Sequence, residues 1–416
     1  MVKLTMIRLC QSTAWLRHIL LKSFENQIFT FQNNAGMKRL FLLTLSFIFS
    51  LTVIGQPVPS VREEHYMIVG TYDSPKSEGV YVYKFNGNDG TAKEISHIKT
   101  PNASFVAVSP NEKFIYAVNE DAPKDGKGGE IVAFTFNKEN GSLSLINKQP
   151  SGGDHPCHVE VDKTGKWVFA SNYSSGSLSV FPVNADGGLG AATTIQHYGA
   201  GKNEQRQKGP HVHGAIISAD NRWLFVTDLG IDKVMIYAFD AATGKLTPAS
   251  QPFAQSEAGS GPRLFTFHPN KKFAYMIEEL SGTIVTYKYK KGKLKTIQRI
   301  STMPQHSTQF AGSADIHVST DGKFLYASNR GDVNTIAIYT INENRGTLSL
   351  IKIQSTLGKA PRNFSIDPSG KFLLAENQNS DEIVIFKRDA TTGLLTDSGN
   401  RVNIGKPVCI KWISIN

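Results

Sequence analysis

The sequence is poor in cysteine and in helical patterns, and each shortage excludes a class of protein. Only three of its 416 residues are cysteine, too few for a disulfide-stapled scaffold. Apolar residues rarely recur at helical spacing, which argues against a helical bundle. No Walker loop, dinucleotide fingerprint or G-x-S-x-G elbow occurs in a strand-to-helix context, so nucleotide-binding folds and α/β-hydrolases are not indicated. Short runs rich in aromatic and β-branched residues remain, which predicts an all-β protein.

Negative charge is also scarce, and the net charge of +10 first suggests a nucleic-acid or membrane partner. Residues 1–55 account for half of this excess, because they carry six Lys or Arg and a single acid, Glu25. The remaining positive charge is spread without a long basic run. We therefore expect no nucleic-acid partner.

An apolar run occurs near the start of the sequence, in MKRLFLLTLSFIFSLTVIGQPVPS from Met37. Its basic start, short apolar core and small-residue exit predict a signal peptide over residues 37–55, and residues 1–36 are then not part of the mature protein. An uncleaved anchor is the alternative, but the run is short for a membrane span. We expect a periplasmic or secreted protein without a stable membrane span, or a cytoplasmic one if the leader does not function. N-terminal sequencing should find a mature start near Gln56.

The rest of the chain repeats. Six segments share a polar turn followed by an aromatic-led strand, as in TGKWVFASNY and DGKFLYASNR, at intervals of 48 to 56 residues. Their lead aromatics are Phe114, Trp167, Trp223, Phe273, Phe324 and Phe372. This period fits a four-stranded propeller blade.

The two ends of the repeat region complete each other. The segment HYMIVGTYDSPKSEGVYVYKFN lacks a first strand, and KPVCIKWISI near the C-terminus supplies one. Together they predict a seventh blade that closes the ring, and hence a seven-bladed β-propeller over residues 62–416. Cys157 and Cys409 fall on non-adjacent elements, so we expect free, buried thiols. We expect a monomer.

Comparison among the blades separates structure from chemistry. Counted from the lead aromatic, position +5 is polar in every blade and is interpreted as structural. Positions −10 and +6 differ between blades and should meet at one mouth of the channel. The residues at −10 are Ser104, Cys157, His213, Arg263, Ala314 and Arg362, and those at +6 are Glu120, Tyr173, Leu229, Glu279, Arg330 and Gln378.

Consecutive blades of this set contribute charged or titratable side chains, namely His213, Arg263 with Glu279, Arg330 and Arg362. Arg263 and Glu279 could form only a surface ion pair. Because Arg330 and Arg362 have no obvious acidic partner at the same mouth, we predict an anion-binding site instead.

The histidines need separate weighing. His158, at position −9, and His317, at position −7, lie on first strands of two separate blades and are predicted to complete the site. Matching Cys or acidic partners for a metal are not evident, so neither a metal nor a cofactor is expected. His268 occupies a turn and is interpreted as structural. The role of His306 stays open, although its loop PQHSTQFAGSAD is long enough to cover the mouth.

These motifs resemble a known family. GPRLFTFHPNKKFAY, SADIHVSTDGKFLYASNR, APRNFSIDPSGKFLL and HVHGAIISADNRWLFV are similar to the bacterial 6-phosphogluconolactonase family of seven-bladed propellers, which also includes carboxy-cis,cis-muconate cyclases. The resemblance covers roughly residues 65–414 and implies that His213, Arg263, Glu279 and Arg330 are the catalytic or binding residues. Two features depart from the family: the predicted leader, and Glu278 in place of a common Asn.

The resemblance implies hydrolysis of an anionic sugar-acid δ-lactone, either 6-phosphoglucono-1,5-lactone or an unphosphorylated relative. Glu279 is the first candidate for the base, with His213 as alternative base or proton donor. Arg263 and Arg330 are expected to stabilise negative charge, with Arg362, His158 and His317 binding substrate. Muconate cycloisomerisation is an alternative on the same fold. A non-catalytic exported propeller that binds a ligand or protein is another.

Overall fold

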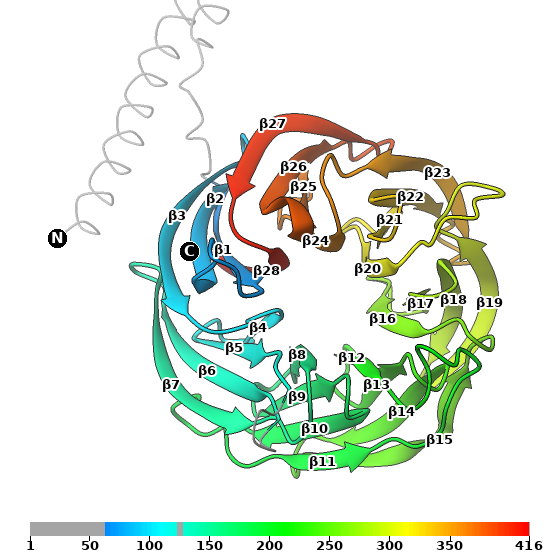
Figure 1. Ribbon diagram of the computed structural model, residues 1–416, viewed down its shortest axis with the longest axis horizontal. Coiled ribbons are helices and arrows are strands. Elements are labelled where there is room, and N and C mark those ends of the chain that lie inside the picture. The colour runs from blue at the N-terminus through cyan, green and yellow to red at the C-terminus, as the bar shows by residue number, and fades with distance from the viewer. Residues whose placement is uncertain (1–62, 123–127, 416) are drawn as a thin grey trace, which may run out of the picture. The chain divides into compact units, whose positions relative to one another are not determined.

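The computed structural model describes residues 63–122 and 128–415, and the predicted leader and the segment before it lie outside these residues. The described chain forms seven four-stranded antiparallel sheets and one short 3-10 helix, η1 (Gln378–Ser380). Figure 1 shows the sheets as blades arranged in a ring around a central channel. No helix among the described residues is long and apolar enough to cross a membrane. The predicted seven-bladed propeller is confirmed.

Each blade runs from an innermost strand at the channel to an outermost strand at the rim. The first blade in chain order consists of β4 (Val106–Val108), β5 (Phe114–Asn119), β6 (Glu130–Asn137) and β7 (Ser142–Pro150). The second consists of β8 (Pro156–Val161), β9 (Trp167–Asn172), β10 (Ser177–Pro182) and β11 (Thr193–Gln196). The third consists of β12 (Val212–Ile217), β13 (Trp223–Asp228), β14 (Lys233–Asp240) and β15 (Lys245–Gln255). The fourth blade consists of β16 (Pro262–Phe267), β17 (Phe273–Glu278), β18 (Thr283–Lys290) and β19 (Lys293–Ser301). The fifth consists of β20 (Ser313–Val318), β21 (Phe324–Asn329), β22 (Thr335–Ile341) and β23 (Leu348–Ser355). The sixth consists of β24 (Pro361–Ile366), β25 (Phe372–Asn377), β26 (Glu382–Arg388) and β27 (Leu395–Asn403).

The seventh blade closes the ring as predicted. It is a composite of β28 (Pro407–Ser414), β1 (Glu64–Thr71), β2 (Gly79–Asn86) and β3 (Thr91–Lys99). β28 pairs antiparallel with β1, with Val69 opposite Ile410, so the C-terminal strand provides the inner edge for the N-terminal ones. Every first strand therefore lies at the channel, and no open sheet remains between the two ends of the repeat.

The lead aromatics lock each blade to the next one. Each ring packs on a glycine in the turn between the third and fourth strands of the following blade. The pairs are Phe114–Gly187, Trp167–Gly244, Trp223–Gly292, Phe273–Gly346, Phe324–Gly393, Phe372–Gly90 and Tyr66–Gly141. At Gly346, whose φ is +73°, an added Cβ would lie 2.4 Å from the Phe273 ring. Glycine is therefore favoured here both by the backbone conformation and by the close packing of the ring. Tyr66 is the lead aromatic of the composite blade, which the repeat comparison had not identified.

The polar residues at position +5 are structural, as predicted. Asn172, Asn329 and Asn377 each donate from Nδ2 to a backbone carbonyl in the connection that leads into their own blade, at 3.3, 3.0 and 3.1 Å. They fix the end of the second strand against that connection. Cys157 and Cys409 are free and buried, which is also as predicted.

A β-bulge sets the direction of the residue at position −10. In the β16–β19 blade the register passes from Pro262 opposite Glu278 to Leu264 opposite Ile277, which leaves Arg263 as the extra residue. The same irregularity skips Cys157, His213 and Arg362 in their blades. A bulge re-aims a side chain at the edge of a sheet, and here it occurs where the innermost strands begin.

Candidate active site

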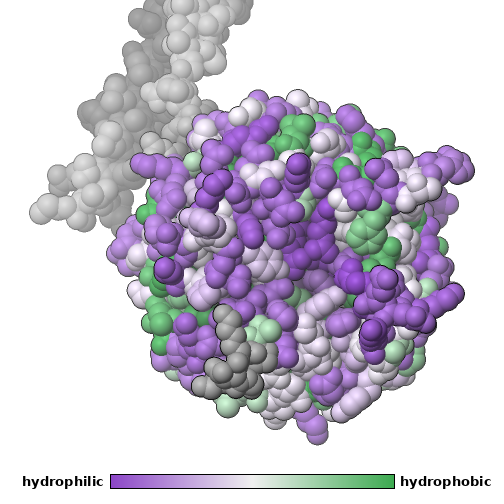
Figure 2. Space-filling view, in the orientation of Figure 1, coloured by the Kyte–Doolittle hydropathy of each residue, from purple (hydrophilic) through white to green (hydrophobic). Residues whose placement is uncertain are grey.

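A cavity of about 420 Å³ opens at the channel mouth formed by the starts of the first strands and the ends of the second strands. Hydrophilic residues surround the hollow at the centre of this face (Figure 2). The side chains that line it are Tyr72, Glu120, Cys157, Tyr173, Arg206, His213, Glu279, Phe310, Arg330 and Arg362. Five of them directly follow a second strand and three are bulge residues, so the two varying positions of the repeat do meet here.

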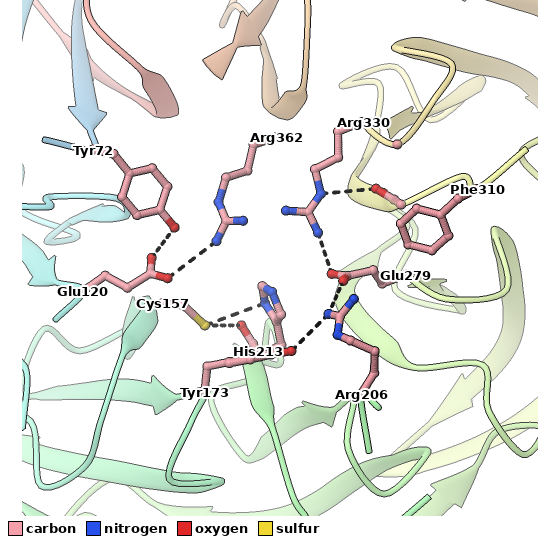
Figure 3. A pocket seen from close by; sticks show the side chains of 12 residues that line it. Tyr72, Glu120, Cys157, Tyr173, Arg206, His213, Glu279, Phe310, Arg330 and Arg362 are labelled. Carbon is pink, nitrogen blue, oxygen red and sulfur yellow. Dashed lines mark hydrogen bonds and ion pairs between the residues drawn. The ribbon is translucent and has the colours of Figure 1, made fainter. Parts of the chain in front are cut away.

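Glu279 is the centre of one side of the cavity. Its carboxylate is 3% exposed and pairs with three arginines: Arg206 Nη2 lies 2.7 Å from Oε1, whereas Arg263 Nε and Arg330 Nη2 lie 3.1 and 2.6 Å from Oε2. We call these four residues the Glu279 cluster. Three different blades or their connections contribute to it, so it ties the ring together at the site (Figure 3).

Electrostatics keep Glu279 ionised. Burial alone would raise the pKa of its carboxyl, but Arg330, Arg263 and Arg206 outweigh burial and lower the pKa to about 2. Arg263 lies beneath the carboxylate, 3% exposed, and also donates to the Ala314 carbonyl. Burial and the positive charges of Arg330 and Arg362 lower the pKa of Arg263 to about 9. The arginines therefore repel one another, and a second anion among them is electrostatically favoured.

The opposite side of the cavity contains Arg362, Glu120 and Tyr72. Arg362 Nη2 lies 3.8 Å from Glu120 Oε1, and the guanidinium lies 5.3 Å from the centre of the Tyr72 ring. Glu120 in turn accepts hydrogen bonds from the Tyr72 hydroxyl, at 2.6 Å, and from Ser104. Among the described residues Arg362 donates no hydrogen bond, so its N–H groups are available to a ligand.

His213 lies between the two sides, on β12 (Figure 3). Its Nδ1 is 3.8 Å from Cys157 Sγ, whereas Nε2 has no hydrogen-bond partner among the described residues. Burial lowers the pKa of His213 well below its ordinary value, and the charges of Arg263, Arg362 and Arg330 lower it further. The imidazole is therefore neutral near pH 7, with one ring nitrogen unprotonated.

The structure places the other predicted site residues outside this cavity. His158 lies deeper in the channel, where its ring centre is 4.4 Å from that of Phe105 and burial lowers its pKa to about 3. It lines a cavity of about 10 Å³ beneath the mouth, together with Arg263 and His213. His317 lies further along its strand, where its Nε2 is 2.8 Å from Asp315 Oδ2. The structure thus brings Arg362 into the same cavity as Glu279 but leaves His158 and His317 outside it.

Two further histidine expectations can be checked. His268 is buried in its turn, and its Nε2 lies 2.9 Å from the Gly322 carbonyl of the next blade, which confirms a structural role. His306 is exposed and does not line the cavity, although Phe310 from the same loop does.

The expectation that Arg330 and Arg362 lack acidic partners was wrong, since Arg330 pairs with Glu279 and Arg362 lies near Glu120. Nevertheless, the described residues that line the cavity or lie directly beneath it include four arginines and two glutamates. The site keeps an excess of positive charge.

Repeat comparison missed several lining residues. Tyr72 follows β1 as Glu279 follows β17, but the composite blade had no assigned lead aromatic. Arg206 and Phe310 belong to the connections 197–211 and 302–312, which are longer than the other connections between described blades and lie outside the repeat. Among the described residues, no group of three or more His, Cys, Asp or Glu could hold a metal ion.

Comparison with known proteins identifies the family. Residues 66–412 match the family described as lactonase, 7-bladed β-propeller. The chain belongs to this lactonase family. A 6-phosphogluconolactonase of Formosa agariphila is 40% identical over 79% of this chain and 94% of its own, and one of Bacillus subtilis is 36% identical over 83% and 97%. The solved structure of a periplasmic gluconolactonase of Pseudomonas aeruginosa has a TM-score of 0.81 at 32% identity and covers 85% of this chain and all of its own. Lactonase family members with these names thus share nearly the whole propeller.

Proposed function

We propose that this protein hydrolyses a δ-lactone of a sugar acid, either 6-phosphoglucono-1,5-lactone or an unphosphorylated aldonolactone, as part of carbohydrate metabolism. The names of its relatives support lactone hydrolysis. The observation that carries the proposal is that one cavity is lined by a neutral histidine, His213, and by an arginine, Arg362, that donates no hydrogen bond to the described residues. A base and an oxyanion-binding cation are the two requirements for ester hydrolysis.

Arg362 and Arg330 are suited to stabilise the transition state. Both guanidinium groups extend into the cavity toward His213 (Figure 3). Arg330 uses Nε for the Gly312 carbonyl and Nη2 for Glu279, which leaves Nη1 available. Hydrogen bonds from these donors to the lactone carbonyl would strengthen as negative charge develops on its oxygen. Interactions that are stronger in the transition state than in the bound substrate lower the activation barrier of hydrolysis.

We assign the base to His213 rather than to Glu279. Both Glu279 oxygens already accept hydrogen bonds from arginines, and a carboxylate with a pKa near 2 has little affinity for a proton. His213 lines the cavity, and its Nε2 has no hydrogen-bond partner in the described part of the chain. Its low pKa weakens it as a base in the empty site, but an anion bound among the arginines would offset their positive charge and raise that pKa.

The proposed reaction then balances in two steps. Water attacks the lactone carbonyl carbon and gives one proton to His213 Nε2, while Arg330 and Arg362 hold the oxyanion. The bond between that carbon and the ring oxygen breaks, and the imidazolium returns the proton to the ring oxygen as it leaves. The product is the open hydroxy acid, and Glu279 keeps the arginines in position throughout.

The test is lactone opening by the purified full chain, measured above the spontaneous rate for glucono-1,5-lactone and its 6-phosphate. His213→Gln should lower kcat by about 10²- to 10⁴-fold, because it removes general-base catalysis. Arg362→Met should lower kcat by about 10²- to 10³-fold, because it removes an oxyanion donor. His97→Gln is the matched control, since His97 is exposed on the outermost strand β3.

Circular dichroism and thermal unfolding should show that the variants remain folded. If the wild-type protein opens neither lactone faster than buffer does, lactone hydrolysis of this class is refuted. If folded His213→Gln retains the wild-type kcat, the base has been assigned to the wrong residue.

A further inference from the structure

Two connections between blades reach over the cavity, and one of them supplies Arg206. The connection from β11 to β12 spans residues 197–211 and that from β19 to β20 spans residues 302–312. The β27–β28 connection, by contrast, is only residues 404–406. A short connection is enough to join two strands of the ring. The extra residues of the two long connections are therefore available for a specific role at the cavity.

The backbone beside Arg206 is fixed by its neighbour. Gln207 is 1% exposed, and its Nε2 donates to the Leu229 carbonyl and to Asp232 Oδ1, both at 2.7 Å. Its Oε1 accepts from the Asn203 backbone N–H at 2.9 Å. A buried, fully bonded glutamine thus anchors the loop, and Arg206 extends from a preorganised position at the rim of the cavity.

The Arg206 side chain is only partly used by the protein. Its Nη2 alone makes the contacts, with Glu279 Oε1 at 2.7 Å and with the Tyr173 hydroxyl at 3.2 Å. Nε and Nη1 donate to none of the described residues, and 39% of the side chain is exposed. Arg263, another arginine at Glu279, is 3% exposed and uses both Nε and Nη1 for protein acceptors. Arg206 therefore differs from it in offering free donors to the solvent side.

The charges of the cavity indicate what these donors would bind. Four arginines and two glutamates line it or lie beneath it within the described part of the chain. The two positive charges in excess match a phosphate monoester, which carries about −1.5 to −2 at pH 7. Arg362 and Arg330 extend into the cavity toward His213, where the reacting carbonyl is placed, whereas Arg206, which is 39% exposed, approaches Glu279 from the side opposite Arg330 (Figure 3).

We propose that Arg206 is a specificity-determining residue that binds a phosphate monoester at the end of the substrate remote from the lactone carbonyl. This inference rests on the proposed lactone hydrolysis and assigns the residue that would distinguish the phosphorylated lactone from the unphosphorylated one. Arginine suits this role because its charge is permanent and its donors match phosphate oxygens. Glu279 holds the guanidinium in place through one nitrogen while the other two remain available.

The experiment compares two substrates that differ only in the phosphate, glucono-1,5-lactone and its 6-phosphate. Arg206→Ala should raise KM for the phosphorylated lactone by about 10- to 100-fold, the equivalent of one or two hydrogen bonds to a charged group. The unphosphorylated lactone should lose only what the change in the Glu279 cluster costs both substrates, so the ratio of kcat/KM for the phosphorylated lactone to that for the unphosphorylated lactone should fall. Any disturbance of Glu279 affects both substrates and cancels in this ratio. Arg206→Lys should retain part of the preference because it retains the charge.

Lys208→Ala is the matched control, because Lys208 is exposed on the same loop, does not line the cavity and removes the same charge. Equal losses for both substrates, or an unchanged ratio, would overturn the proposal. So would a wild-type protein without preference for the phosphorylated lactone. Calorimetric binding of 6-phosphogluconate and gluconate separates this inference from turnover: a preference for the phosphorylated acid that Arg206→Ala abolishes supports it even if hydrolysis fails.

Discussion

Glu278 and Glu279 are consecutive, buried and paired with arginine, yet they belong to different parts of the molecule. Glu278 is fully buried at the end of β17, where Arg299 donates Nη1 to Oε1 at 3.1 Å and Nη2 to Oε2 at 2.7 Å. Arg299 lies on β19, so this pair closes within one blade. Glu279 instead pairs with arginines from three separate segments of the ring. The two glutamates differ in the direction of their side chains: that of Glu278 contacts its own blade, whereas that of Glu279 contacts the arginines at the cavity.

The comparison shows that burial and pairing do not by themselves identify a functional carboxylate. Both glutamates satisfy the rule that a buried charge is paired. What distinguishes Glu279 is that its partners also face a cavity, and that two of them, Arg206 and Arg330, retain N–H donors without acceptors among the described residues. The proposed function rests on these unused donors rather than on the ion pairs.

The sharpest way to break this comparison is to neutralise each glutamate in turn. Glu279→Gln should lower kcat by about 100-fold, because released arginines lose the geometry that the reaction needs. Glu278→Gln should cost about 1–3 kcal/mol of unfolding free energy, because Arg299 loses two charge-assisted hydrogen bonds but keeps Glu257 Oε1 at 2.9 Å from its Nε, and it should spare kcat per folded molecule. Lactone opening and urea unfolding on the same samples measure both effects.

The two variants serve as controls for each other, because each makes the same Glu→Gln change at adjacent positions. Comparable losses of turnover in both variants would show that the distinction between blade and site is wrong.

A pH titration sharpens the comparison with a smaller effect. The Glu279 carboxyl has a pKa of about 2 in the folded protein against an ordinary 4.5. Its ionisation therefore stabilises the fold fully above pH 4.5, and this contribution, about 3 kcal/mol, is lost as the pH falls from 4.5 toward 2. Wild type should lose that much more stability over this interval than Glu279→Gln in urea unfolding. Parallel stability curves for the two proteins would contradict it.

The fold was predictable because each repeat has the same local sequence pattern, a polar turn followed by an aromatic-led strand. The lead aromatics Phe114 to Phe372 and their polar turns recur at a steady period, and each packs against the next blade in the same way. The composite blade was the hardest part, since Tyr66 and β28 lie at opposite ends of the chain. Ring closure still predicted their pairing, because an open inner edge is unfavourable.

The site was predictable to the extent that it lies on the repeat. Glu279, His213, Arg330 and Arg362 occupy the two positions that vary between blades, so comparison within one sequence found them. Arg206 could not be found that way, because its connection is longer than those of the other blades and Arg206 has no matching position in them. Nor could the choice between Glu279 and His213 as base, which depends on how many arginines reach each group. Only the length of the connection 197–211 hinted that it carries something specific.

The smallest effect is expected at Cys157, which tests whether proximity to His213 signifies chemistry. Its Sγ is 3.8 Å from His213 Nδ1, an arrangement that could suggest a nucleophilic Cys–His pair. Burial, however, raises the pKa of this thiol, and the carbonyls of His213 and Val212 lie 3.5 and 3.9 Å from Sγ as acceptors for its proton. A neutral, buried thiol is a poor nucleophile. Cys157→Ala should therefore keep kcat close to wild type, without an initial burst of product in either protein. A large loss of kcat in a folded variant, together with a burst in the wild type, would replace direct water attack with a thioester intermediate.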